Sequence, residues 1–208
     1  MPAPARASVV LVHRLYMNGW DQRLLAHRLA RAGFRVRIFR YPTLRERPLE
    51  NGRALAAYAA GAGPVHFVAH SLGGLVVRHA LAQADLPPGR VVTLGTPHTG
   101  SSAAAWLSVR GWGRPLLGRA LDQGLLGGAP DFPPAWQTGA IAGTLRLGLG
   151  MVIPGIPRPN DGTVAVAETA LPGCADRLVL PVSHFGLLVS ARVAQAAGHF
   201  LDHGRFAI

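Results

Sequence analysis

The 208-residue chain contains no lysine and a single cysteine, Cys174. A single cysteine cannot form an intramolecular disulfide. It is also not paired with a second ligand at the spacing of zinc sites, which argues against a structural zinc site. No apolar run is long enough to cross a bilayer, because the stretch 139–153 holds Arg146 and stops at Pro154. Charged residues make up only 15% of the chain and hydrophobic residues 49%, which argues against a disordered chain.

Acidic residues are also scarce. Ten of them stand against 21 arginines, so the formal net charge is +11. A positive balance can attract nucleic acid or anionic lipid. The arginines are scattered along the chain and no recognition-helix, zinc-finger or aromatic RNA-binding signature accompanies them, so we expect no nucleic-acid partner. Peripheral contact with an anionic membrane surface stays open. The sequence indicates no obligate protein partner.

The amino terminus carries no secretory signal. Residues 1–7 are short and broken by prolines, and the apolar residues 9–12 that follow indicate a strand rather than the longer apolar region of a signal peptide. We therefore expect a cytoplasmic protein. At this length we expect one domain, spanning 1–208, with a sizeable core.

Apolar segments alternate in type along the chain. We expect strands over 8–13, 34–41, 65–70, 90–94 and 140–145, and a last one ending near 182; we expect helices over 19–32, 49–60, 75–84 and from about 189 to 203. Alternating strands and helices predict an α/β fold, a mostly parallel sheet with helices on both faces.

The apolar run 65–70 ends at Ser71, and two glycines follow at positions 73 and 74. A serine at a sharp turn from strand to helix holds its hydroxyl exposed above the sheet edge, as in a nucleophile elbow. The usual pattern is G-x-S-x-G, and Ala69 stands here in the first glycine place. A small side chain is required there because the backbones approach closely. Ser71 is the candidate nucleophile.

A serine hydroxyl needs a base, and the base needs an orienting acid. Among the nine histidines, His184 is the one that is both late in the chain and at the end of an apolar run, 177–184. Asp161 lies between serine and histidine in an Asn-Asp-Gly turn signal. Glu168 is the second choice for the acid. Asp161 could also serve only to shape its turn through its own backbone.

Four motifs together resemble those of a bacterial lipase/esterase of the α/β-hydrolase superfamily, near the class-2 lipase-like group. They are Val12-His13 with Leu15, the segment 69–74, the segment 95–101, and Asn160-Asp161-Gly162 followed by 184–188. The resemblance implies a small α/β-hydrolase core with about six strands in the order 2-1-3-4-5-6. It implies a small-molecule or lipid ester as substrate, and the chemistry requires no metal and no organic cofactor.

The same resemblance assigns the oxyanion hole to the backbone N–H groups of Leu72 and Leu15. Similar lipases carry glycine where this chain has Arg14. Because arginine lacks the ready access of glycine to positive φ, we expect either a different loop path or an activity that is reduced or redirected. The Arg14 side chain either reaches the substrate pocket, where it would favour an acidic substrate, or is exposed on an altered loop.

Residues 101–137 form a long insert that is rich in tryptophan and leucine. An insert after a strand, above the catalytic edge, is where a cap or lid is built, and we expect Trp112 and Leu116 to line the substrate site. The alternative is an ordinary helix pair that covers the core.

Two further histidines lie close to these motifs. We expect His98 to hold the loop 95–101. We expect His70 to pack or form a hydrogen bond away from the chemistry, because neighbouring strand residues face opposite sides.

The sequence thus predicts a serine hydrolase that cleaves carboxylic esters through a triad of Ser71, Asp161 and His184 and an acyl-enzyme intermediate. An acyltransferase or thioesterase would use the same triad. A binding protein that keeps the fold and has lost catalysis is a further alternative, and Arg14 is the one feature that favours it.

Overall fold

A computed structural model describes residues 8–60, 63–148, 151 and 153–207. Residues 1–7, which carry the signal-peptide argument, and three residues of the stretch 139–153 lie outside the described residues. In the described part, six parallel strands form one sheet in the order β2-β1-β3-β4-β5-β6. This confirms the expected fold class. The strands are β1 (Ser8–Val12), β2 (Arg35–Phe39), β3 (Val65–His70), β4 (Arg90–Leu94), β5 (Gln137–Gly143) and β6 (Asp176–Leu180).

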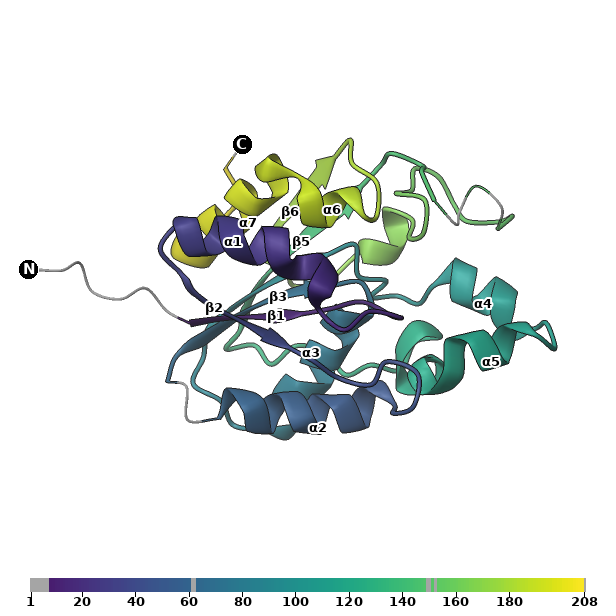
Figure 1. The fold of residues 1–208 in the computed structure, drawn as a ribbon, viewed down its shortest axis with the longest axis horizontal. Coiled ribbons are helices and arrows are strands. Elements are labelled where there is room, and N and C mark those ends of the chain that lie inside the picture. The colour runs from purple at the N-terminus through teal and green to yellow at the C-terminus, as the bar shows by residue number, and fades with distance from the viewer. Residues whose placement is uncertain (1–7, 61–62, 149–150, 152, 208) are drawn as a thin grey trace, which may run out of the picture.

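Helices cover both faces of the sheet (Figure 1). The α-helices are α1 (Arg23–Arg31), α2 (Pro48–Ala59), α3 (Leu72–Gln83), α4 (Ser102–Ser108), α5 (Gly113–Leu117), α6 (Gly186–Val189) and α7 (Ala191–His203). Helices α1, α6 and α7 lie on one face, and α2 and α3 lie on the other. Single turns of other helix types are η1 (Trp20–Gln22), η2 (Gly118–Ala120), η3 (Leu121–Leu125) and η5 (Ala167–Thr169). No helix in the described residues combines the length and apolar character needed to cross a bilayer.

The alternation of side chains along the central strands divides the core into two clusters. Val10 and Val12 of β1 pack in the cluster that contains α2 and α3. Val9 and Leu11 pack in the cluster that contains α1 and α7. All four are fully buried. A strand covered on both faces reads as an uninterrupted apolar run, which is why the sequence shows β1 and β3 so plainly.

Several element bounds differ from expectation. Strand β2 and helix α1 are shorter than the expected 34–41 and 19–32, and three other differences follow. Strand β5 begins at Gln137 rather than near 140, and Gln137 pairs with Arg90 at the start of β4. Within this early part of the strand, Gly139 lies so close to the Phe200 ring that a side chain would not fit. Helix α3 begins at Leu72, directly after the elbow, rather than at 75. The final helix is divided at Ser190, whose Oγ accepts the N–H of Val193 and caps α7.

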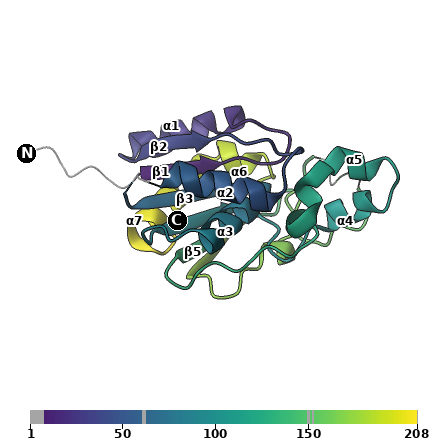
Figure 2. The same ribbon diagram turned by 90° about the horizontal axis from the view of Figure 1, so that it is seen from below.

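The segment between β4 and β5 extends beyond the carboxyl ends of the strands, where α4 and α5 stand apart from the sheet (Figure 2). A buried arginine of α3, Arg78, ties this segment down. Its guanidinium donates to the carbonyl oxygens of His98 and Ala129, and it pairs with Asp131, each at 3.0 Å. The fork of guanidinium donors thus satisfies loop carbonyls that a lysine could not span.

Candidate active site

Ser71 occupies the tight turn between β3 and α3. Its φ of 54° and ψ of −121° are strained for a residue with a side chain. The N–H of Ser71 donates to the carbonyl oxygen of Leu94 at 2.9 Å, which fixes the turn to β4. Two residues after Ser71, Gly73 lies close to the backbone of β1. A Cβ at this position would collide with the carbonyl oxygen of Val12, so glycine is required. The chain therefore places the serine side chain at the sheet edge by backbone geometry alone.

His184 and Asp161 form a buried pair, 4% and 1% exposed. His184 Nδ1 lies 2.7 Å from Asp161 Oδ2. A carboxylate oxygen accepts this hydrogen bond, so Nδ1 carries the hydrogen. The backbone N–H of His184 also donates to the carbonyl oxygen of Asp161, at 2.8 Å. The imidazole is thus held in the tautomer that a general base requires.

The second oxygen of Asp161 has a structural task. Oδ1 accepts the N–H groups of Thr163 and Val164 at 2.9 and 2.8 Å. Asp161 therefore has both of the roles that the sequence offered for it. One oxygen shapes the turn, and the other accepts a hydrogen bond from the imidazole. The two interpretations are compatible.

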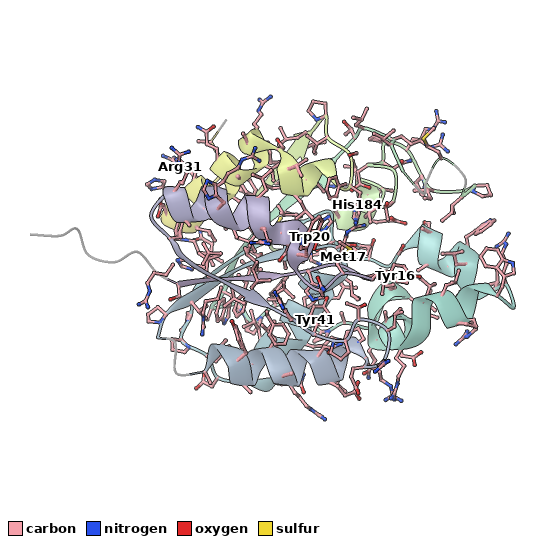
Figure 3. The ribbon with its side chains drawn as sticks, viewed as in Figure 1. Tyr16, Met17, Trp20, Arg31, Tyr41 and His184 are labelled. Carbon is pink, nitrogen blue, oxygen red and sulfur yellow. The ribbon has the colours of Figure 1, made fainter. Side chains whose placement is uncertain are left out.

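Ser71 and His184 line the same cavity, which has a volume of about 470 Å³. Tyr16 also lines this cavity, and Figure 3 labels it together with His184 in the central part of the molecule. Among the described residues no hydrogen bond joins Ser71 Oγ to the imidazole. In sites without substrate such bonds are often long and tighten only when substrate binds.

No protein-family model and no curated protein sequence matches the chain. Solved structures do match. The mature lipase BlEst2 of Bacillus licheniformis has a TM-score of 0.74 at 23% identity, over 98% of this chain and 94% of the lipase. The metagenomic carboxyl esterase MGS0156 gives 0.62 at 18% identity, over 88% of this chain and 65% of the esterase. A pyrethroid hydrolase from Sphingobium faniae JZ-2 gives 0.63 at 16% identity, over 95% and 98%.

The chain has the α/β-hydrolase fold. In open sheets of this kind, ligands bind outside the carboxyl ends of the strands. Ser71 follows β3, Asp161 lies between β5 and β6, and His184 follows β6. The α/β-hydrolase topology therefore explains how residues up to 113 positions apart arrive at one edge.

Glu168, the second choice for the acid, is committed elsewhere in this fold. Its Oε1 accepts the N–H of Ser102 at 2.6 Å, and its Oε2 accepts the N–H of Ala165 at 2.8 Å. Ser102 is the first residue of α4, so the carboxylate caps that helix. Both oxygens are occupied by backbone donors, and the pair with His184 is made by Asp161.

In the described part of the chain, neither of the two N–H groups that the resemblance assigns to the oxyanion hole donates a hydrogen bond to another protein group. The N–H of Leu72 opens α3 and has no partner within the helix. Leu15 lines the cavity. Positive φ falls on Tyr16, at 65°, and not on Arg14. The loop therefore does not require from Arg14 the conformation that glycine provides.

Arg14 lies in the cavity wall, and its side chain is 30% exposed. Its Nε lies 3.4 Å from Oδ2 of the buried Asp21. Arg14 thus lines the cavity, as one alternative expected, and is also partly exposed, as the other expected. The ion pair holds the guanidinium beside the loop that carries Leu15.

The cavity wall is largely apolar. The segment between β4 and β5 contributes most of it, including both residues expected from the sequence, through Trp106, Leu107, Trp112, Leu116, Leu117 and Leu125. The other side is formed in part by Ile153 and Val164. Trp112 and Leu116 remain 58% and 47% exposed, so they lie at the mouth. A cleft of this size and character suits an apolar small molecule or chain.

His70 packs and forms a hydrogen bond, as expected, but the sequence did not indicate that its partner is His184. This fully buried side chain places Nε2 3.0 Å from the carbonyl oxygen of His184, and the two ring centroids are 4.5 Å apart. Since a carbonyl only accepts, Nε2 of His70 carries the hydrogen. Burial, with a smaller contribution from the neighbouring His184, lowers the pKa of His70 well below its usual value, so the ring is neutral. No local signal marks this contact, because 114 residues separate the partners.

His98 holds its loop, as expected. Its Nε2 lies 3.1 Å from Thr93 Oγ1, and its carbonyl oxygen accepts from Arg78. Burial lowers the pKa of His98 to about 3. In the described residues no group of His, Cys, Asp and Glu side chains is arranged to hold a metal ion.

Proposed function

We propose that this chain is a serine hydrolase that cleaves carboxylic esters through an acyl-enzyme intermediate. One observation carries the proposal: the hydrogen bond between His184 and Asp161 stands behind a cavity that Ser71 also lines. Nucleophile, base and orienting acid are the parts that acyl transfer requires. The names of the matching structures, a lipase, a carboxyl esterase and a pyrethroid hydrolase, agree with this proposal.

The proposed reaction has two steps. Nε2 of His184 takes the proton of Ser71 as the serine oxygen attacks the ester carbonyl, and Asp161 stabilises the imidazolium that forms. His184 then gives the proton to the departing alcohol, which leaves the acyl group on Ser71. Water, deprotonated by the same imidazole, releases the acid and restores the serine.

The N–H groups of Leu72 and Leu15 are the proposed donors to the oxyanion of the tetrahedral intermediates. Loss of one such donor typically costs about 3–4 kcal/mol of transition-state stabilisation. The neighbouring segment around Trp112 and Leu116 acts in this proposal as a cap over the acyl group, because its apolar side chains form most of the cavity wall.

Hydrolysis of p-nitrophenyl esters by wild type and Ser71→Ala tests the proposal. We expect hydrolysis by wild type and none above background by the variant. Equal rates would remove the assignment. A thioester and an added alcohol acceptor in the same assay separate the hydrolase from a thioesterase or an acyltransferase with the same triad.

A further inference from the structure

Exposed apolar side chains gather around the mouth of the cavity. Trp112 and Leu116 line the cavity and are also about half exposed. Other exposed apolar residues lie in the segments beside the mouth: Val109, Leu145, Leu147 and Phe185. We call these six residues the rim. An exposed apolar patch around a cavity marks a place of contact with another apolar surface.

The segments that carry the rim adjoin one another. The N–H of Leu145 donates to the carbonyl oxygen of Val182, two residues before His184. The backbone of Leu147 lies directly against Gly162, whose neighbour Thr163 lines the cavity. Phe185 follows His184 in the chain. Helices α4 and α5 and the start of the connection between β5 and β6 lie beyond the carboxyl ends of the strands, away from the start of β1 (Figure 1).

The stretches that hold five of the six rim residues, 86–121 and 132–160, contain arginines and no acidic residue. Between Asp85 and Asp122 the sequence has no acidic residue, and the part of it that bears the rim holds Arg110, Arg114 and Arg119. Between Asp131 and Asp161 there is again no acidic residue, and Arg146 and Arg158 occur. Arg114 is exposed. The guanidinium of Arg110 lies over the Trp106 ring, which lines the cavity. Apolar side chains are thus interleaved with arginines and with no carboxylate.

We propose that the rim binds the surface of an anionic lipid bilayer, with the cavity mouth toward the lipid. Apolar side chains would enter the boundary between headgroups and acyl chains, and the arginines would contact lipid phosphates. The absence of acidic residues from the stretches 86–121 and 132–160 is what favours an anionic bilayer over a neutral one. The proposal concerns binding alone, so it can hold or fail independently of ester hydrolysis.

Co-sedimentation of the full chain with vesicles tests this, without any substrate. We expect tighter binding to vesicles of phosphatidylcholine mixed with phosphatidylglycerol than to phosphatidylcholine alone, and weaker binding as salt rises. Arg114→Gln should weaken binding to the mixed vesicles about fivefold. Val109→Asp, at a side chain 82% exposed, should weaken it about tenfold or more.

Two matched controls distinguish the rim from the overall positive charge. Arg31→Gln changes an exposed arginine on α1, far from Tyr16 and the mouth (Figure 3). Val179→Asp changes a side chain of β6 that is 45% exposed. Both should bind the mixed vesicles like wild type. Equal binding to the two kinds of vesicle, an equal loss in Arg31→Gln and Arg114→Gln, or equally tight binding of a DNA duplex would overturn the proposal. Thermal melts show that each variant is folded.

Discussion

The ring of His70 lies against the ring of His184 and donates a hydrogen bond to its carbonyl oxygen across 3.0 Å. The residue directly before the proposed nucleophile thus supports the proposed base. Because His70 is buried and its pKa is lowered, it adds no positive charge beside the imidazolium that the proposed mechanism forms on His184. We infer that His70 positions His184 and does not exchange protons with substrate.

Replacing His70 should therefore lower kcat and leave KM nearly unchanged. His70→Phe keeps a ring and loses the hydrogen bond, and we expect kcat to fall about fivefold, the equivalent of one ordinary hydrogen bond. His70→Gln can donate to the same carbonyl oxygen and should retain more activity. Steady-state kinetics over a pH series provides the measurement. Wild-type kcat in His70→Phe would remove the positioning role.

The positive φ of Ser71 predicts that the residue at this position lowers the stability of the fold unless it is glycine. Ser71→Gly relieves a positive φ that glycine adopts freely, whereas Ser71→Ala keeps it. We expect both variants to be inactive and the glycine variant to be more stable than the alanine variant by about 1 kcal/mol. Urea unfolding of the two variants measures the difference. An alanine variant that is the more stable of the two would show that the turn is not strained.

The two candidate acids can be separated by isosteric amides. Asp161→Asn should lower kcat about 10³–10⁴-fold, because the imidazole loses its orienting carboxylate. Glu168→Gln should leave ester hydrolysis near wild type and lower stability by about 1 kcal/mol, because one of its two oxygens can no longer accept a backbone N–H. Kinetics and unfolding of both variants test this. The assignment of the acid fails if the Glu168 variant loses activity and the Asp161 variant keeps it.

Buried histidines should make the fold sensitive to acid. The unfolded state binds a proton to His98 near the ordinary pKa of 6.5, while burial lowers the pKa of His98 in the folded state to about 3. Stability is therefore unaffected above pH 6.5 and falls as pH drops below it, by up to about 1.4 kcal/mol per pH unit for this residue, until the folded pKa is reached.

His98→Gln removes that contribution, so its unfolding free energy should depend less steeply on pH between 6.5 and about 3 than that of wild type. His13, His66, His70 and His79, whose pKa values burial also lowers, keep a residual dependence in the same direction. Urea unfolding across this pH range tests it. Identical slopes in variant and wild type would contradict the account.

The apolar wall predicts a role for Trp112 in acyl-chain selection. Trp112→Ala should change the preference of the enzyme within a series of p-nitrophenyl esters, with the largest loss in kcat/KM for the longer chains. Trp20→Ala is the matched control, because Trp20 is 66% exposed and does not line the cavity. An unchanged chain-length preference in Trp112→Ala would count against a substrate-lining role.

Much of the fold could be predicted because its central strands are covered on both faces. Such strands appear as apolar runs, and β4 was predicted with the bounds that the structure has, 90–94. The exact ends of some helices and strands were harder to predict. The hydroxyl of Ser190 caps a new helix within a continuous helical pattern, and Gly139 lets β5 lie close to Phe200 of α7.

For the candidate site, too, the sequence predicted the residues that have a local signal and not the contacts between distant segments. Ser71, Asp161 and His184 each sit at a local signal, a strand end or a turn, so chain order was enough to choose them. The partners of Glu168, Arg78 and His70 are set by contacts between distant segments, and nothing adjacent to these residues encodes them. The positive φ on Tyr16 depends likewise on a tertiary contact, its N–H bond to Thr43 at 3.1 Å.

Labelling with a fluorophosphonate probe tests the activated serine most directly, since the probe reacts only with a serine whose hydroxyl a base deprotonates. Intact-mass and peptide analysis of wild type should locate one adduct on Ser71, and both Ser71→Ala and His184→Ala should remain unlabelled. An unlabelled wild type, or a Ser71→Ala variant that labels like wild type, would contradict the proposed triad.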